Sequence, residues 1–185
     1  WPGMKRDERN HIHHAGRQMP AACGRLAGIC GIASVLEQAR DWRGHIDGCV
    51  YCAGIVGRAR LRDTSPEFMA ERMQVNCFSF VETVRILVKL KKKTQPLQVA
   101  AISSFAALGH DKYLIGMQLQ GALEAAAKTM AAELISRNTA VNIIRAAFVN
   151  TPMISGAGDP LGDFTTRLEE SGYQPLGVIP PEEVA

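Results

Sequence analysis

The sequence predicts an α/β domain in which a doubly wound, parallel sheet is covered by helices on both faces. Short apolar stretches that fit buried strands alternate with longer stretches whose apolar residues recur at helical spacing. The strand candidates are almost entirely apolar, as strands are when both faces of a sheet are covered. Strands that alternate with long helices are typical of parallel sheets, because each crossover connection carries a helix back over the sheet.

Length and composition are those of one ordinary globular domain. The chain has 185 residues, of which 46% are hydrophobic and 21% charged, so we expect a single domain over residues 1–185. Its formal net charge of +3 is too small to favour a nucleic-acid partner. The sequence has no apolar run as long as a membrane span. An odd count of five cysteines, without a secretory signal pattern, favours a reducing, cytoplasmic location.

The beginning of the chain carries the weakest pattern. Residues 1–23 are polar, and we expect little regular structure there apart from some helix around residues 6–15. Three histidines in this segment suggest metal binding, but an exposed, loosely ordered segment is the favoured interpretation; they are His11, His13 and His14. Residues 24–30 (GRLAGIC) predict a short strand.

A helix and a strand follow. Apolar residues at helical spacing predict a helix over residues 33–42, and Gly44 ends it, as glycine often does. Residues 46–52 then predict a buried strand, in which Cys49 and Cys52 form a Cys-x-x-Cys pattern. Because residues three apart in a strand point to opposite faces, we interpret both as small buried hydrophobic residues and not as a metal or redox pair.

A long helix comes next. Ser65 supplies a hydroxyl cap, Pro66 suits the first turn and Glu67 complements the helix dipole. We expect this helix to run over residues 67–92, with a change of direction near Asn76. The lysine-rich run that closes it complements the dipole at its carboxyl end.

Two more strands with a helix between them complete the pattern. Residues 97–103 (LQVAAIS) and 140–148 (AVNIIRAAF) predict the strands, residues 115–136 predict the helix, and a partly helical tail occupies residues 160–183. In a sheet of this class, ligands bind outside the carboxyl ends of the strands. Residues at those ends therefore define the candidate site, although this physical pattern alone names no reaction.

Several motifs stand at these strand ends and beyond them in a characteristic order. Cys52-Ala53-Gly54 closes one strand, Asn76 lies in the following helix and Ile102-Ser103-Ser104 closes the next strand. Later motifs are GALE at 121–124, MAAEL at 130–134, FVNTPM at 148–153, PLG at 175–177 and PEEVA at 181–185. Together, over residues 46–185, they resemble the short-chain dehydrogenase/reductase family, especially its 3-oxoacyl-(acyl-carrier-protein) reductase branch. The resemblance implies a Rossmann-like doubly wound sheet.

The resemblance also implies an NAD(P)-dependent reductase that acts on a small-molecule carbonyl or acyl-carrier substrate, and no metal site. Ser103 and Asn76 stand at catalytic positions of the family. Ala53, Gly54 and Thr151 stand at positions that contact the cofactor, NADP or NAD. The alternative roles are structural: Ser103 and Asn76 would serve backbone hydrogen bonds, and Thr151 would cap a helix.

Two positions depart from the chemistry of the family. Counted from Ser103, the family's general-acid tyrosine falls at Gly116, and the lysine that lowers the pKa of that tyrosine falls at Gln120. Gly116 has no side chain and Gln120 no charge, so a developing alkoxide loses its usual proton donor. Tyr113 is a candidate substitute, although Met117 stands where the family's spacing would require a lysine, and the alternative is an ordinary loop tyrosine.

The cofactor side departs as well. The family's glycine-rich loop, which brings backbone amides to the pyrophosphate, has no counterpart in the sequence. The family's acidic adenine contact falls at Gly28, and the asparagine of its Asn-Ala-Gly motif falls at Cys52. The family's first strand, first helix and second strand are unmatched, as are its last helix and strand. We therefore expect a fold that is incomplete at both ends, as a piece of a longer protein; the alternative is a rebuilt sheet.

Two functional hypotheses remain open. The first is a carbonyl or 3-oxoacyl reductase with impaired catalysis. The second is a non-catalytic subunit that assembles with an active paralogue or another partner. The resemblance implies a homo- or hetero-oligomer through the helices at 67–92 and 115–136, and neither nucleic acid nor a membrane is expected as a partner. Cofactor binding separates the hypotheses, because a reductase cannot lose it.

Overall fold

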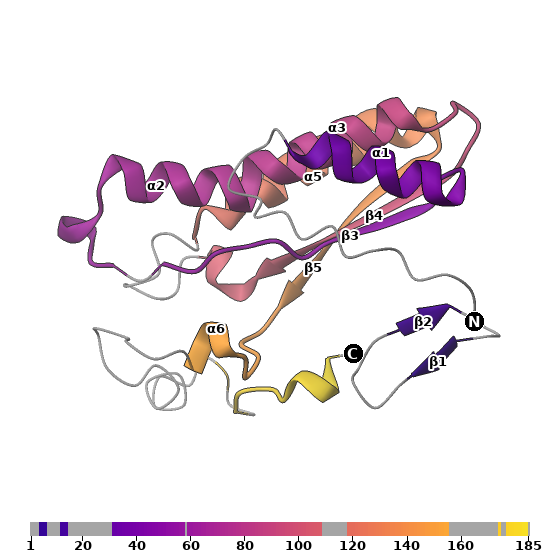
Figure 1. Ribbon diagram of the computed structural model, residues 1–185. Coiled ribbons are helices and arrows are strands. Elements are labelled where there is room, and N and C mark those ends of the chain that lie inside the picture. Colours follow the sequence, from indigo (N-terminus) through magenta and orange to yellow (C-terminus); the bar gives the residue numbers. More distant parts are fainter. Residues whose placement is uncertain are drawn as a thin grey trace.

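A parallel sheet forms the centre of the computed structural model, which describes residues 4–6, 12–14, 31–57, 59–108, 118–155, 174 and 177–184. The strands of this sheet are β3 (Gly48–Tyr51), β4 (Leu97–Ser104) and β5 (Thr139–Ala146), in the order β3-β4-β5 (Figure 1). Strand β4 pairs in parallel with both neighbours, with Gly48 opposite Gln98 on one side and Leu97 opposite Thr139 on the other. The prediction of a parallel α/β sheet is confirmed.

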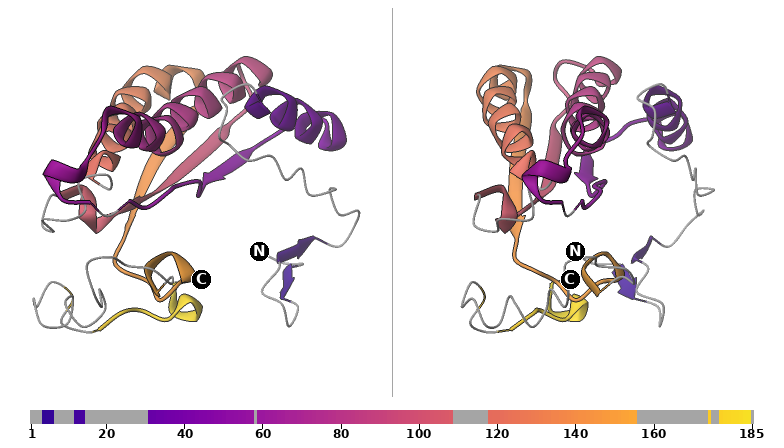
Figure 2. Two further views of the ribbon diagram at one scale, coloured as in Figure 1. Left: turned by 60° about the vertical axis from the view of Figure 1, so that its left-hand side comes forward. Right: turned by 90° about the vertical axis from the view of Figure 1, so that its left-hand side faces the viewer.

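Three long helices lie together over one face of this sheet: α1 (Ile32–Arg43), α3 (Ser79–Leu90) and α5 (Gln120–Leu134) (Figures 1 and 2). For α3 and α5 the common side follows from the strand order. Crossover connections between parallel strands are right-handed, so connections that step from β3 to β4 and from β4 to β5 in one direction place their helices on one face. The sequence predicted helices on both faces, and the long helices of the described part occupy only one.

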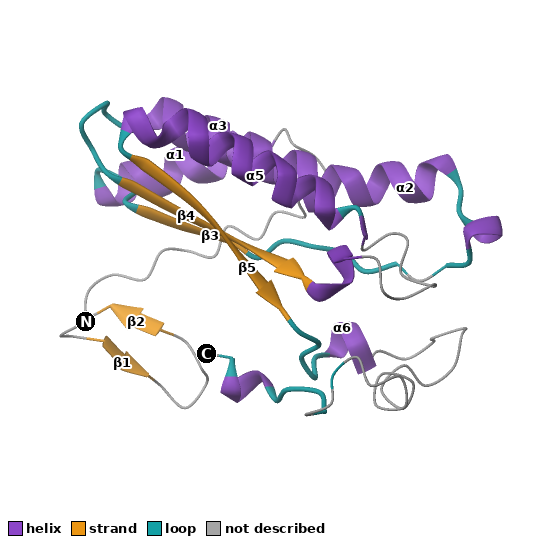
Figure 3. Ribbon diagram, turned by 180° about the vertical axis from the view of Figure 1, so that it is seen from behind, coloured by secondary structure: helices purple, strands orange, loops and turns teal. Residues whose placement is uncertain are grey.

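Figure 3 shows the molecule from behind, again with the long helices on one side of the sheet. On the other face of the sheet, Val50 of β3 is 64% exposed and Ile144 of β5 is 52% exposed. Within the described ranges, no long helix covers these strands. The strands are nevertheless apolar on both faces of the sheet, and this pattern led to the correct prediction that they are parallel.

The first described helix, α1, matches its prediction closely. Gly44 ends it with a positive φ of 81°, and its backbone N–H donates to the Arg40 carbonyl at 2.6 Å. A left-handed residue at this place is favourable for glycine, which has no Cβ to clash. The glycine therefore sets the turn from α1 towards β3.

The predicted change of direction near Asn76 is a π-helical turn. Helix α2 (Pro66–Met73) passes through the π turn Gln74–Phe78 into α3. The Ser65 hydroxyl accepts from the Phe68 N–H at 3.1 Å, which is the predicted cap. Side chains stabilise carbonyls in the widened turn: the Tyr51 hydroxyl donates to the Val75 carbonyl at 2.6 Å. Such π turns are rare and frequently lie at functional sites.

The hydrophobic core lies between the sheet and the three helices. Its centre is Phe80 of α3, whose ring centroid is 5.3 Å from that of Tyr51. The other buried members come from β4, β5, α3 and α5: Val84, Leu87, Val88, Leu97, Val99, Ala101, Leu123, Ala127, Leu134 and Val141. Cys49 packs against this core while Cys52 is exposed, so the two thiols diverge as predicted, but the prediction that both are buried is wrong for Cys52. Cys52 lies just past the end of β3, where the core no longer covers the chain.

The amino-terminal segment corrects one prediction. β1 (Met4–Arg6) and β2 (Ile12–His14) form an antiparallel pair, with Met4 opposite His14, so the helix expected around residues 6–15 is wrong. That expectation rested on local propensity, because the segment has no apolar stripe that would pack a helix against the core. The strand predicted over residues 24–30 lies outside the described residues.

Beyond α5, a 3₁₀ turn (Ile135–Arg137) leads into β5, so the predictions for 115–136 and 140–148 hold apart from their ends. Helix α6 (Pro152–Ser155) follows β5. Val149 forms a parallel bridge with Ile179, and the final 3₁₀ turn is Pro181–Glu183. Most of the predicted tail lies outside the described residues. None of the described helices is long and apolar enough to cross a membrane.

Candidate functional site

The carboxyl ends of β3, β4 and β5 meet at one edge of the sheet, as they must when the strands are parallel. Ser103 lies near the end of β4 and faces Arg145 of β5 in the register. Gly54 follows the end of β3, Asn76 lies in the π turn, and Gln120 begins α5. Four polar or charged residues from four elements thus gather beside the one edge where ligands of such sheets bind.

Asn76 fastens the loop after β3 to the helix layer. Its side chain is fully buried, its Oδ1 accepts from the Ile55 N–H at 2.8 Å, and its Nδ2 donates to the Ile55 carbonyl at 3.0 Å. Both ends of the amide are therefore satisfied by one residue. Both bonds join Asn76 to backbone groups, which is the kind of contact expected of a structural asparagine.

A second clamp holds the same loop further along. Arg72 of α2 donates from Nη2 to the Val56 carbonyl of the loop at 3.5 Å and from Nη1 to the Phe68 carbonyl of its own helix at 3.0 Å. Its guanidinium lies 3.5 Å from the centroid of the Phe68 ring. A Cβ at Gly57 would overlap that guanidinium. The loop from Gly54 to Gly57 is therefore fixed by Asn76 at one end and by Arg72 at the other.

Ser103 takes part in a buried network that crosses three elements. Its side chain is 2% exposed, and its Oγ donates to Glu124 Oε1 of α5 at 2.7 Å. Arg145 of β5 donates to both oxygens of the same carboxylate, from Nε to Oε1 at 3.0 Å and from Nη2 to Oε2 at 2.5 Å. The proton of Ser103 is therefore directed at a carboxylate that is itself held by an arginine.

The charges of this network reinforce each other. Hydrogen bonds from Arg145 lower the pKa of the Glu124 carboxyl; burial opposes this shift, and the Ser103 hydrogen bond adds to it. Glu124 in turn raises the pKa of Arg145. The pair is consequently ionised at neutral pH, and Glu124 acts only as a hydrogen-bond acceptor.

Gln120 differs from its neighbours because its amide is not satisfied. Only 7% of the residue is exposed, and its Oε1 is buried without a hydrogen-bond partner in the described part of the chain. A Cβ built on Gly54 would lie 3.8 Å from Gln120 Nε2 and 3.7 Å from Asn76 Oδ1. Gly54 therefore lies between two amide side chains, and we call these three residues the amide cradle.

The structure brings some predicted site residues together and leaves others outside. Gly54, Asn76 and Ser103 lie at the same edge of the sheet, and Ala53 packs against the core beside Gly54. Thr151 lies in a bend directly before α6 and is half-buried. Tyr113 and Gly116, with Gly28, lie outside the described residues.

Sequence reasoning missed Glu124 and Arg145. A signal was present, because Glu124 interrupts the buried side of α5, where it follows Leu123 and precedes Ala127. Arg145 likewise stands near the end of an apolar strand. A charge on each of two apolar faces indicates an ion pair, since burying one charge alone is costly.

The residues at this edge fit a nucleotide cofactor in one respect. Gln120 Oε1 has no hydrogen-bond partner in the described part of the chain, and a Cβ would fill the space beside Gly54. A polar group of a cofactor has room to bind there. Within the described ranges, no group of three or more histidine, cysteine or acidic side chains is placed to hold a metal ion.

A parallel sheet with a polar site at the carboxyl ends of its strands is the plan of the dinucleotide-binding α/β proteins. The family model described as Enoyl-(Acyl carrier protein) reductase matches residues 30–185. The chain therefore belongs to this family of the short-chain dehydrogenases/reductases, and the resemblance stated from the sequence motifs is confirmed.

Two curated relatives are similar to this chain. Carbonyl reductase family member 4 of Xenopus laevis is 29% identical over 162 residues, which cover 83% of this chain and 63% of the relative. The protein of the same name from Xenopus tropicalis is 31% identical over 147 residues, which cover 77% of this chain and 58% of the relative. The chain thus spans about three fifths of the length of these relatives.

Solved structures share the fold. The enoyl-acyl carrier protein reductase of Bacillus cereus, with NADP+ and indole naphthyridinone, has a TM-score of 0.72 at 20% identity, over 87% of this chain and 62% of that one. An enoyl-(acyl-carrier-protein) reductase from Anaplasma phagocytophilum, in complex with NAD, has a TM-score of 0.62 at 20% identity, over 70% of this chain and 51% of that one. At this identity the likeness establishes the fold alone.

Proposed function

We propose that the chain belongs to an NAD(P)H-dependent carbonyl or 3-oxoacyl reductase whose turnover is impaired at the proton-transfer step. The observation that carries this proposal is the hydrogen bond from Ser103 Oγ to Glu124 Oε1 at 2.7 Å. It directs the hydroxyl proton of Ser103 at a carboxylate and so away from any substrate carbonyl. The carbonyl reductase relatives and the NADP+ and NAD complexes among the structural neighbours support the class of reaction and of cofactor.

Carbonyl reduction needs a hydride at carbon and a proton at oxygen, and a bound NAD(P)H supplies only the hydride. The proton must come from an acid within hydrogen-bond reach. Glu124 cannot provide it, because Arg145 holds its pKa low. Gln120 is neutral and has no acidic proton. The described residues at this edge therefore orient groups but deliver no proton.

Tyr51 is the one tyrosine among the described residues, and its hydroxyl is already hydrogen-bonded to a backbone carbonyl. Burial raises its pKa to about 12, and its hydroxyl donates to the Val75 carbonyl at 2.6 Å. A phenol with that pKa gives up its proton reluctantly near neutral pH. Residual turnover would then depend on Tyr113 or on water, and Tyr113→Phe tests the first of these.

Cofactor contacts in this proposal come from the loop after β3 and from the segment after β5. Ala53 and Gly54 bring backbone to the edge, where Asn76 and Arg72 fix the loop. Thr151 precedes α6 and would contact the nicotinamide side. These residues bind and orient the cofactor, and none of them takes part in proton transfer.

Titration of the protein with NADPH and NADH, followed by nicotinamide fluorescence, tests this function. Micromolar binding supports it and leads directly to the turnover measurement on Tyr113→Phe. An absence of binding at millimolar cofactor would overturn it and favour the non-catalytic subunit.

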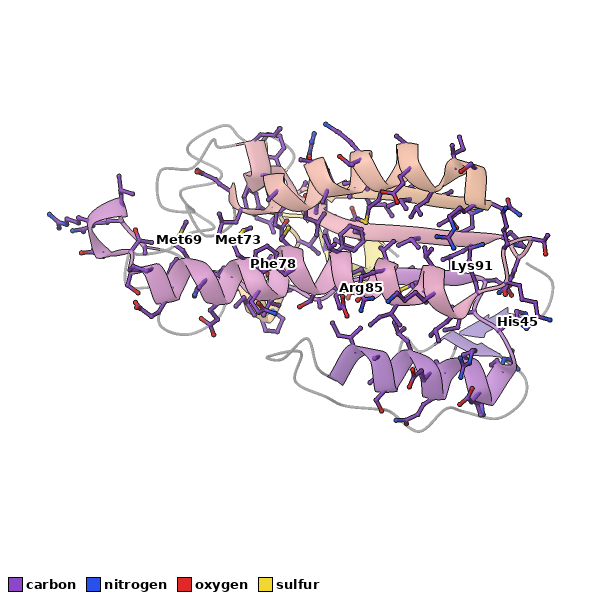
Figure 4. The ribbon with its side chains drawn as sticks, turned by 90° about the horizontal axis from the view of Figure 1, so that it is seen from above. His45, Met69, Met73, Phe78, Arg85 and Lys91 are labelled. Carbon is purple, nitrogen blue, oxygen red and sulfur yellow. The ribbon has the colours of Figure 1, made fainter. Side chains whose placement is uncertain are left out.

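A second candidate function, partner binding, rests on a groove between α3 and α5. The groove has a volume of about 280 Å³ and an apolar floor with charged ends, and its lining residues are Val81, Val84, Arg85, Val88, Lys89, Met130, Glu133, Leu134 and Arg137. Figure 4, which looks down on the helix layer, shows Phe78 and Arg85 along the helix that forms one wall. We propose a homo- or hetero-oligomer through the helices at 67–92 and 115–136. Light scattering should show dissociation in Met130→Asp and none in Thr129→Asp, a control on the exposed side of α5.

A further inference from the structure

The segment that follows β5 is held by a buried glutamine from the last part of the chain. Gln174 is 9% exposed, and its side chain bonds only to backbone groups. Its Oε1 accepts from the Phe148 N–H at 2.8 Å, and its Nε2 donates to the carbonyls of Phe148 and Gly177, at 3.0 Å and 2.6 Å. One amide therefore bonds both backbone polar groups of Phe148, which lies just beyond the end of β5.

This pairing distinguishes Gln174 from the buried glutamine of the amide cradle. Gln120 Oε1 has no partner in the described part of the chain, whereas both polar atoms of the Gln174 side chain are bonded. Fixing a long side chain in one place costs rotamer entropy. Gln174 is 26 residues from Phe148 in the sequence, so its ordered side chain joins two segments that are far apart along the chain.

Backbone pairing continues beyond the Gln174 side chain. The Ile179 N–H donates to the Phe148 carbonyl at 3.1 Å, and the Asn150 N–H donates to the Ile179 carbonyl at 2.8 Å. Val149 and Ile179 thereby form a parallel bridge. The Gln174 amide bonds the Phe148 N–H one residue before this bridge, where a longer strand would have placed a carbonyl. The side chain therefore extends the pairing of the segment after β5.

Phe148 also joins the loops at the carboxyl ends of the strands. It is 7% exposed and forms a small apolar cluster with Ala106, against which Val56, Phe105 and Val178 pack. These residues come from the loop after β3, the 3₁₀ turn after β4, the segment after β5 and the last part of the chain. Because packed side chains transmit displacements to their neighbours, a shift of Phe148 would disturb the loops after all three strands.

We propose that Gln174 is a positioning residue for cofactor binding, which holds the segment after β5 where Thr151 can contact the nicotinamide. Thr151 lies three residues after Phe148 and directly precedes α6, so the place of Phe148 limits the place of Thr151. Gln174 itself contacts no ligand and takes no part in proton transfer. This inference deepens the proposed function and rests on it for the cofactor.

The expected size of the effect follows from pre-organisation. When only a fraction of the molecules holds a binding segment in the competent arrangement, the apparent affinity falls by that fraction. If loss of the Gln174 amide leaves the segment in place for about a tenth of the time, NADH should bind about tenfold more weakly. The same opening exposes the Phe148 and Asn150 N–H groups to exchange with solvent. Binding and hydrogen exchange therefore report one local equilibrium.

The first variant, Gln174→Leu, removes the three hydrogen bonds and keeps an apolar side chain of similar size. In the ligand-free protein, hydrogen exchange measured by mass spectrometry should be about tenfold faster over residues 148–150 and unchanged in α3. Nicotinamide fluorescence should show NADH binding about tenfold weaker than in the wild type. Gln98→Leu, at an exposed position near the amino end of β4, is the matched control and should change neither quantity.

The second variant, Gln174→Glu, tests rescue by a side chain of the same shape. Burial favours the protonated form of the new carboxyl, which can accept from the Phe148 N–H and donate to a carbonyl, as the amide does. At about pH 6, NADH affinity should lie within about threefold of the wild type. Above about pH 8, where the ionised form faces carbonyl oxygens, it should be about tenfold lower. The backbone groups bonded to this side chain do not titrate, and the wild type measured alongside gives the baseline.

The outcomes separate this inference from the proposed function. Faster exchange confined to the segment after β5, weaker NADH binding in Gln174→Leu and recovery in Gln174→Glu at low pH support the positioning role. Unchanged exchange in Gln174→Leu, or exchange that rises equally in α3, overturns it, as does a Gln174→Glu protein that binds equally weakly at both pH values. A wild type that binds neither NADH nor NADPH overturns the proposed function and this role with it. Equal NADH affinity in the wild type and Gln174→Leu overturns the positioning role alone.

Discussion

The two sides of the site at the carboxyl edge of the sheet are built in different ways. On the side of β3 and the α2–α3 helix, an amide side chain pairs with backbone groups through the bonds between Asn76 and Ile55, and Arg72 Nε is buried without a partner in the described part of the chain. On the side of β4, α5 and β5, the bonds are charged, and Gln120 stays unpaired. The first side is a scaffold that holds a loop. The second side carries the charged network and the unpaired Gln120 oxygen on which the proposed function is argued.

Loss of the scaffold should have the largest effect. In Asn76→Leu, the N–H and carbonyl of Ile55 lose their partners, which should lower the free energy of unfolding by about 2–4 kcal/mol. Urea unfolding measures this. Asn142→Leu, on the exposed side of β5, is the control and should stay within about 0.5 kcal/mol of the wild type. Equal effects in the two variants would contradict the scaffold role.

Loss of the arginine on the charged side should cost somewhat less. Arg145→Met leaves the buried Glu124 carboxylate without its main partner, and removing one member of a buried pair is costly. Because the Arg145 side chain is 40% exposed, solvent screens part of the effect, and we expect a smaller fall in the free energy of unfolding than in Asn76→Leu. Lys93→Met, at an exposed position, should change the free energy of unfolding by less than about 0.5 kcal/mol. A similar change in both variants would show that the pair does not stabilise the fold.

The same pair predicts a dependence of stability on pH. The pKa of Glu124 is lowered in the folded chain, so its contribution is present above the unfolded value of about 4.3 and is lost as pH falls through the folded value. Below about pH 4.5 the free energy of unfolding should fall. Arg145, Ser103 and Lys128 act on this carboxyl.

Glu124→Gln should flatten this acid limb. Some slope should remain, because Glu67 and Glu82 also have lowered pKa values. Denaturation curves between pH 3 and 7 (roughly the range over which carboxyl groups titrate) compare the two proteins. An acid limb of the same steepness in both would show that Glu124 does not contribute to it.

Ser103→Ala should have the smallest effect. It removes one of three hydrogen bonds to Glu124, which should lower the free energy of unfolding by about 0.5–1.5 kcal/mol. Any residual turnover should change by less than about threefold, because the Ser103 proton already points away from the substrate. A loss of about a hundredfold or more would indicate a serine that stabilises the reacting oxygen and would refute this assignment.

The scaffold side was largely predictable from the sequence. The apolar run at 97–103 and the start signal at Ser65 and Pro66 are local, and local patterns determined both elements correctly. The change of direction at Asn76 was also anticipated, although its cause, a π turn held by Tyr51, depends on contacts between residues far apart in the sequence.

The charged side was not predictable in the same way. Glu124 and Arg145 each resemble an ordinary surface charge until the helix and the strand are placed side by side. The sequence did locate Gln120 as a departure from the family, but its unpaired oxygen depends on what the surrounding side chains leave unsatisfied. The common face of the helices likewise required the strand order, which local patterns do not give.

The central claim is that reductase chemistry in this chain is limited by proton delivery and not by the fold. The most direct test compares NADPH oxidation with a 3-oxoacyl substrate in the wild type and in Gly116→Tyr/Gln120→Lys, which restores the tyrosine and lysine of the family. We predict that the double variant is faster by about 10²–10⁴-fold, the usual contribution of a positioned acid. An unchanged rate in the double variant would contradict the claim.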